Sequence, residues 1–130
     1  MIDIDIIVPV THVKIAGQRV QDLLVSAFEG GSNDWYSDLT PHYPKKQSVL
    51  DFWHCDLPLI PGGYVTLEAV GADKDPHKVF RIDIKTITAG LQRMAEKDPK
   101  AFSDFMDEAD DAITADVFLQ YVCFGEVIFS

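Results

Sequence analysis

The spacing of apolar residues changes along this chain, and each change marks a different kind of backbone. Residues 2–6 alternate isoleucine with aspartate and a shorter alternation falls in residues 10–15, so both segments are predicted to be short strands. Between residues 20 and 28 the apolar residues recur every three to four positions, which is typical of an amphipathic helix. Gly30 and Gly31 predict its end. The apolar stripe consists of Val20, Leu23, Leu24, Ala27 and Phe28.

Strand spacing returns in the middle of the chain. Residues 64–70 and 78–82 alternate on either side of a turn-rich segment, and together they predict an antiparallel hairpin. Residues 32–63 carry four prolines and five aromatic residues. The aromatic residues indicate that this stretch packs onto the body of the protein, although no regular spacing assigns it to helix or strand.

The last third of the chain is predicted to be helical. Asp83 is expected to cap a helix that ends at Asp98, and Asp98 to cap a further helix with Pro99 at its first position. A last helix is expected to end at Gly125 and to be followed by a short strand over 127–129. The residues predicted to face the core from these helices are Ile84, Ile87, Leu91, Met94, Phe102, Phe105, Met106, Ile113, Val117, Tyr121 and Phe124.

These elements favour a mixed fold. A chain of 130 residues is the size of one domain, so we expect a single α+β domain over 1–130. The expected architecture is a small, mostly antiparallel sheet of about four strands packed by about four helices.

The charge of the chain limits its partners. Eleven Lys and Arg against 21 Asp and Glu give a formal net charge of −10, which disfavours direct binding to nucleic acid or to an anionic membrane. No apolar run is long enough to span a bilayer, and two cysteines favour a reducing cytosol over a disulfide framework. We therefore expect a cytoplasmic protein whose partner is a protein with a basic surface.

The acidic residues are concentrated near the C-terminus, where residues 101–130 contain seven of them and no Lys or Arg. We predict that a partner-binding surface lies here and faces water. The alternative is a solvated face that only confers solubility. The predicted surface consists of Asp104, Asp107, Glu108, Asp110 and Asp111.

Residues with catalytic or metal-binding chemistry are few. His54, Cys55 and Asp56 are adjacent, but adjacent residues on a strand point to opposite faces and no second histidine is singled out as a base. The cysteines and histidines lack zinc-site spacing, and the acidic cluster lacks the calcium-loop pattern. We expect no enzyme activity, no cofactor and no metal. The alternative is a small thiol- or metal-dependent enzyme around Cys55.

A glycine-containing segment, the motif loop, follows the first predicted helix. Its glycines come after a helix, whereas phosphate-binding glycines precede one, so we interpret it as a helix end and a turn. Trp35 and Tyr36 are expected to fold back onto Leu23, Leu24 and Phe28. The motif loop consists of Glu29, Gly30, Gly31, Ser32, Asn33, Trp35 and Tyr36.

Two segments together resemble small uncharacterised proteins encoded by bacteriophages and prophages. The first is AFEGGSNDWY at residues 27–36, and the second is TADVFLQ at residues 114–120 with FGEV at 124–127. Residues 91–105 fit the middle helix of that family, whereas residues 37–63 have no counterpart. The family has no assigned activity. The resemblance implies a phage origin, and hence the cytoplasm of a host bacterium.

A phage origin changes the expected function. By analogy with other small acidic phage proteins, we expect a non-enzymatic accessory protein that acts by protein–protein contact, for example as an inhibitor of a nucleic-acid-directed host defence such as CRISPR. Carboxylates on such a protein can take the places of nucleic-acid phosphates. A structural or assembly component of the virion is the alternative.

Overall fold

The computed structural model confirms the α+β class and describes residues 4–8, 13–31, 35–44, 55–70, 78–109 and 111–129. The strands are β1 (Asp5–Val8), β2 (Val13–Ala16), β3 (Tyr36–His42), β4 (Tyr64–Ala69) and β5 (Lys78–Ile82). The α-helices are α1 (Gly17–Ser26), α2 (Ile84–Lys97), α3 (Pro99–Met106) and α4 (Ala112–Phe124). A π-helical turn, η1 (Ala27–Gly31), extends α1, and a 3-10 turn, η2 (Leu57–Leu59), precedes β4.

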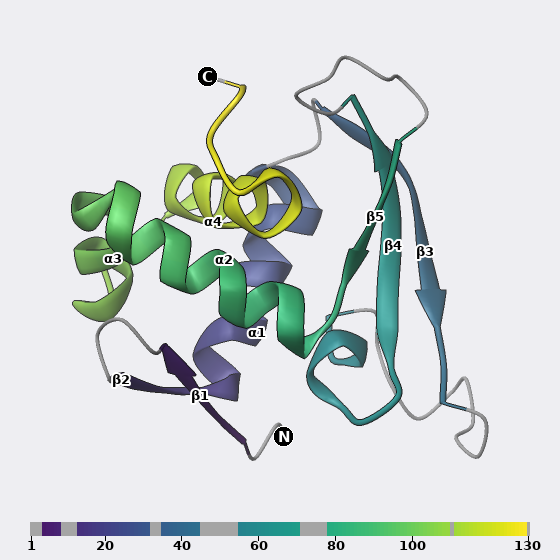
Figure 1. The fold of residues 1–130 in the computed structure, drawn as a ribbon, viewed down its shortest axis with the longest axis horizontal. Helices are drawn as coiled ribbons and strands as arrows, with labels where there is room; N and C mark the ends of the chain where they lie inside the picture. Colours follow the sequence, from purple (N-terminus) through teal and green to yellow (C-terminus); the bar gives the residue numbers. More distant parts are fainter. Residues whose placement is uncertain are drawn as a thin grey trace.

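The strands form two small antiparallel sheets on different sides of the helices. β1 pairs with β2, and their buried residues Ile6 and Ile15 face each other across the pair. β3, β4 and β5 form the second sheet, with β4 in the centre. Figure 1 shows the helices gathered beside this sheet, while the β1–β2 pair lies below them. The core therefore lies between the helices and the inner face of the three-stranded sheet.

The predicted hairpin of β4 and β5 is confirmed. Every second residue of β4 is buried, beginning at Val65, so one face of the sheet packs on the core and the other faces outward. β3 was not predicted from the sequence. It pairs with β4 through an irregular register between Ser37 and Thr40, and Asp38 adopts a φ of 53° there. This bulge, together with Pro41, removes the regular alternation by which a strand is recognised.

Aspartates begin three of the helices, as predicted for two of them. The Asp83 carboxylate accepts hydrogen bonds from the backbone N–H groups of Lys85 and Thr86, and the Thr86 hydroxyl accepts one from the Asp83 N–H. Asp98 accepts from Ala101 N at 3.1 Å, which starts α3 directly after α2. Gly125 ends α4 with a φ of 72°, a conformation that favours glycine.

The predicted core is correct along α1 and α2 but wrong at several helix ends. The apolar stripe of α1 and η1 is buried, as are Ile87, Leu91 and Met94. Ile84, Met106 and Ile113 were predicted to be buried and are instead 39%, 40% and 74% exposed. Each lies in the first or last turn of its helix, where the stripe extends past the neighbouring elements.

The buried face of α4 includes Tyr121, as predicted, but is otherwise rotated from the predicted one. It includes Ala115, Phe118, Leu119 and Val122, whereas Val117 is only half-buried. Because α4 is apolar around most of its surface, spacing alone did not identify the inner face. The short strand predicted at 127–129 is also absent from these described residues, since a side chain of α4 holds that segment instead.

Helices α2 and α4 cross in direct backbone contact at Gly90. A Cβ atom placed on Gly90 would lie 2.7 Å from Val122 Cγ2 and 2.8 Å from Val122 Cα. Glycine is therefore required at this crossing. None of the helices in the described ranges is both long and apolar enough to cross a membrane.

Candidate functional site

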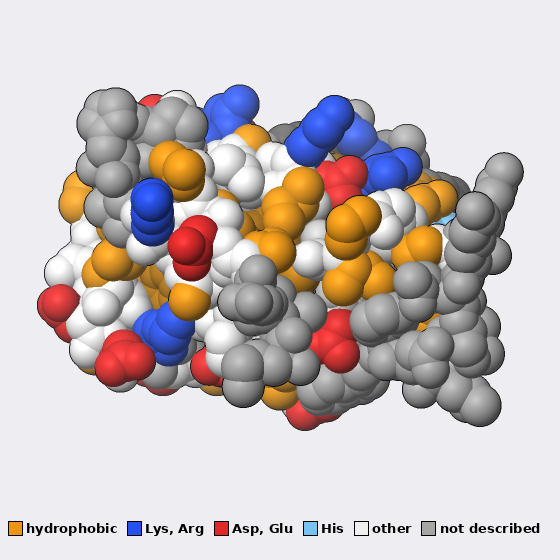
Figure 2. Space-filling view, turned by 90° about the horizontal axis from the view of Figure 1, so that it is seen from below, with side chains coloured by type: hydrophobic (Ala, Val, Ile, Leu, Met, Phe, Trp, Pro, Cys, Tyr) orange, Lys and Arg blue, Asp and Glu red, His pale blue; other side chains and the backbone are white. Residues whose placement is uncertain are grey.

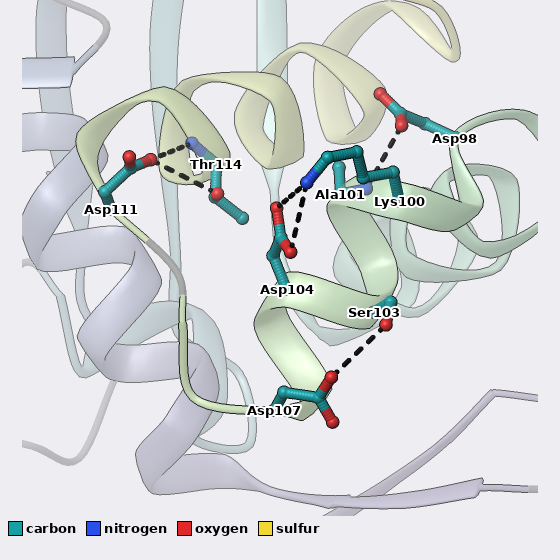
Figure 3. Close-up of polar contacts among 8 residues, drawn as sticks. All are labelled: Asp98, Lys100, Ala101, Ser103, Asp104, Asp107, Asp111 and Thr114. Carbon is teal, nitrogen blue, oxygen red and sulfur yellow. Dashed lines mark hydrogen bonds and ion pairs between the residues drawn. The ribbon is translucent and has the colours of Figure 1, made fainter.

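Three of the predicted acidic residues, Asp104, Asp107 and Asp111, lie around the link between α3 and α4 (Figure 3). Asp104 lies near the end of α3, and Lys100 Nζ approaches its Oδ2 to 3.1 Å, one turn earlier in the helix. Asp107 follows α3, is exposed and accepts a 3.4 Å hydrogen bond from the Ser103 hydroxyl. Asp110 lies outside the described residues. The two described carboxylates on α3 and its C-cap thus have local polar partners.

Glu108 and Asp111 serve different roles in this link. Glu108 has a φ of 58°, and its Oε1 lies 3.8 Å from Arg19 Nε on α1. Asp111 caps α4 and accepts from the Thr114 N–H at 3.0 Å. Hydrogen bonds, the largest of them from the Thr114 backbone, lower the pKa of Asp111, so it remains charged at neutral pH.

The structure therefore places three of the predicted acidic residues in two separate hollows, and Asp107 lines neither of them. Asp104 and Asp111 line a groove of about 290 Å³ between α3 and the start of α4, which we call the acidic groove. Glu108 lines a separate hollow of about 220 Å³ beside Arg19. The acidic groove consists of Asp98, Lys100, Ala101, Asp104, Asp111, Ile113, Thr114 and Val117.

Two residues of the acidic groove were not predicted as site residues. Asp98 was interpreted only as a helix cap, yet its carboxylate also lines the groove. Ile113 was predicted to be in the core and stands 74% exposed next to the Asp111 cap. An apolar side chain surrounded by polar groups is compatible with the apolar centre and polar rim of protein interfaces. The only indication in the sequence that Ile113 would be exposed was its position in the first turn of a predicted helix.

The motif loop is structural where the structure describes it. Glu29 and Gly30 are exposed in η1, with Gly31 at its end, while Ser32 and Asn33 lie outside the described residues. The Tyr36 hydroxyl donates to the Phe28 carbonyl at 3.1 Å and the two rings meet edge to face. The predicted return of Tyr36 onto Phe28 is therefore confirmed.

Trp35 packs on the C-terminal segment, and the prediction that its partners lie on α1 is corrected. Its ring stacks on Phe129 with centroids 5.8 Å apart and lies 5.1 Å from that of Phe124. Its indole N–H donates to Asp116 Oδ1 at 2.6 Å. These contacts were not foreseen because they join residues that are 81 or more positions apart.

Gln120 completes this arrangement from inside α4. Its buried amide nitrogen donates to Asp116 Oδ2 and to the Phe129 carbonyl, at 2.9 and 3.0 Å. Its amide oxygen accepts from the N–H groups of Ile128 and Phe129. We call Trp35, Asp116, Gln120, Phe124 and Phe129 the closing junction. It brings together residues 27–36 and 114–129, which are far apart in the sequence.

The cysteines do not form a reactive centre in the described structure. Cys55 is fully buried, and burial together with the charges of Glu29 and Asp56 raises its thiol pKa to about 12. Burial also raises the pKa of the Cys123 thiol. Neither thiol is therefore an effective nucleophile at neutral pH. No group of three potential metal-binding side chains gathers within the described ranges, and His54 falls outside them.

Comparisons with family models, curated proteins and solved structures gave no match to this chain, so its function is inferred from its own residues.

Proposed function

We propose that this protein is a non-enzymatic phage accessory protein that binds a basic host protein through the acidic groove. The observation that carries the proposal is the exposed Ile113 within an acidic rim. Ile113 is 74% exposed, and a partner that covers it removes apolar surface from water, which stabilises the complex. Surrounding carboxylates select a partner of opposite charge.

The charge of the groove favours a cationic partner segment. Three carboxylates line it, from Asp98, Asp104 and Asp111, against the single ammonium group of Lys100. The chain as a whole carries −10, so its field attracts basic surfaces from a distance and repels nucleic acid.

This charge also supports the more specific proposal of an inhibitor. Proteins that act on nucleic acid present basic grooves to phosphates, and a row of carboxylates can occupy the same positions. Binding to such a protein would then exclude its nucleic acid. The buried Cys55 thiol gives no support to the alternative of a thiol-dependent enzyme.

The experiment is affinity capture from a bacterial lysate with variants that separate the groove from the rest of the surface. Ile113→Ser should remove the specifically captured protein, whereas Val79→Ser, which changes another exposed apolar residue on β5, should retain it. The captured protein should release DNA or RNA oligonucleotides when the wild-type protein binds it. Capture that is equal for both variants would reject the acidic groove as the binding surface.

A charge variant tests the electrostatic part of the proposal. Asp104→Lys in the groove, combined with Asp107→Lys on the adjoining α3–α4 link, leaves the three helix-capping aspartates in place and should slow association with the purified partner by about tenfold or more. Asp5→Lys with Asp22→Lys makes the same change in net charge at exposed positions outside the groove and should have a much smaller effect. Equal association rates for the two double variants would contradict local recognition.

A further inference from the structure

A second groove lies at the opposite end of α2 from the α2–α3 connection. It is bounded by the segment after η2, by β5 and by the first turn of α2, and its volume is about 670 Å³. That is more than twice the volume of the acidic groove, and it falls within the range of roughly 300–1,000 Å³ that is typical of small-molecule sites. We call it the basal groove. Neither the motif loop nor the acidic surface contributes to it.

The floor of the basal groove is apolar. Ile4, Leu59, Ile60, Pro61 and Ile84 line it, and they come from three separate parts of the chain. Figure 2 views this side of the molecule and shows hydrophobic side chains gathered near the middle, with Lys and Arg side chains along one edge. Ile84 is 39% exposed, although the helical spacing predicts that it is buried. The groove thus explains an apolar residue left partly uncovered at the start of α2.

Arg81 is held in a fixed position at the edge of this floor. Its guanidinium carbon lies 3.8 Å from the centroid of the Tyr64 ring, and its Nε donates to Asp83 Oδ2 at 2.8 Å. Tyr64 in turn stacks on His42, with centroids 4.3 Å apart. Within the described part of the chain, the two terminal guanidinium nitrogens of Arg81 have no hydrogen-bond partner. They form a pre-oriented pair of donors, the arrangement that a carboxylate accepts best.

Lys85 adds a second positive charge to the groove. Its side chain is exposed, and its ammonium group has no ion-pair partner among the described residues. The nearby carboxylate of Asp83 is already occupied by Arg81 and by the backbone N–H groups of Lys85 and Thr86. Partial burial acts to raise the pKa of Asp83, but these hydrogen bonds outweigh it and lower the pKa. Asp83 therefore stays ionised and keeps Arg81 in place, and the groove retains an excess of positive charge.

We propose that the basal groove binds a small organic anion with an apolar body and one carboxylate group. The carboxylate pairs with the terminal nitrogens of Arg81 and with Lys85, and the body lies on Ile60, Pro61 and Ile84. Charge complementarity selects this ligand class, because the two cations border an apolar floor in a chain whose net charge is −10. The proposal is independent of the function proposed for the acidic groove.

Octanoate is a suitable probe, and its binding can be followed by NMR titration of the full chain. Saturable shifts are expected for the backbone amide groups of Ile60, Gly62, Gly63, Ile84 and Lys85. Octan-1-ol, which has the same apolar body and no charge, should bind at least about tenfold more weakly. Arg81→Gln and Lys85→Gln should each weaken octanoate binding, Arg81→Gln by about tenfold. Arg93→Gln removes a charge from the same helix outside the groove and should leave the affinity unchanged.

Three results would overturn the proposal: no saturable shifts with octanoate, shifts that map outside the groove, or equal affinity for wild type and Lys85→Gln. The Lys85 side chain makes no hydrogen bond or ion pair within the described residues, so this variant tests the proposal even if Arg81→Gln does not fold. Ile113→Ser should bind octanoate normally. A failure here thus remains distinct from a failure of the acidic groove.

Discussion

Two aspartates of helix α4 have different roles. Asp116 belongs to the closing junction, whereas Asp111 caps the helix at the acidic groove. Both oxygens of the half-buried Asp116 are engaged, one by Trp35 and one by Gln120. Asp111, five residues earlier, caps the helix while its side chain remains exposed. Acidic residues close together in the sequence thus divide into one that closes a junction from a half-buried position and one that caps a helix from an exposed position. The following predictions test that division.

Loss of the Trp35 ring should give the largest effect on stability. Trp35→Ala removes the stacking on Phe129 and leaves Asp116 Oδ1 without its indole donor, so the free energy of unfolding should fall by about 3 kcal/mol. Urea denaturation measures this change. Trp35→Phe retains most of the packing and should lose less. A loss below about 0.5 kcal/mol for Trp35→Ala would show that the junction is not structural.

Gln120 should rank second. Gln120→Leu leaves the N–H groups of Ile128 and Phe129 without their acceptor, at a cost of about 2 kcal/mol. Hydrogen exchange should accelerate at these two amides. Gln92→Leu is the control, because the side-chain amide of Gln92 donates a hydrogen bond to Glu96. This variant should leave hydrogen exchange at residues 128 and 129 as it is in the wild type. Equal exchange in the two variants would contradict the role of Gln120.

Alanine substitutions around the acidic groove should separate cap from surface. Asp111→Ala removes the acceptor of the Thr114 N–H and should lower the melting temperature, while Asp111→Asn retains a capping oxygen and should not. Asp107→Ala should leave the melting temperature unchanged, because exposed charges contribute little to stability. A destabilised Asp107→Ala variant would assign that carboxylate to the structure instead.

The dependence of stability on pH should give the smallest effect. The pKa values of Asp83 and Asp111 are lowered in the folded protein, so their stabilisation is complete above the unfolded-state pKa of about 4 and is lost as pH falls through the folded-state pKa. Urea midpoints measured between about pH 7 and about pH 2 should show this loss. Asp111→Asn should show less of it, and an unchanged pH profile would contradict the assignment.

Local signals in the sequence predicted much of the fold but little of the sites. The caps at Asp83 and Asp98 and the glycine at Gly125 act within one or two turns, so the helix limits followed from the sequence alone. The bulged strand β3 carries no regular spacing and was missed. Likewise, the inner face of α4 depends on which helices pack against it. Because α4 is apolar around most of its surface, its sequence does not indicate which face is buried.

The candidate sites depend on contacts between distant segments. The acidic groove forms because Asp98 and Ile113 come together beside the α3–α4 link. The basal groove likewise joins residues 4, 59–63 and 81–85. A charge count located the acidic region correctly on the chain. It did not show that Glu108 turns toward Arg19 or that Lys100 approaches Asp104.

The crossing at Gly90 links the two proposed binding surfaces mechanically. The first turn of α2 lines the basal groove, and the first turn of α4 lines the acidic groove. Between them the helices touch backbone to backbone, with no side chain at Gly90 to absorb a displacement by changing rotamer. A tilt of either helix at this crossing would therefore require the backbone of the other to move as well, because no side chain at Gly90 can make room for it.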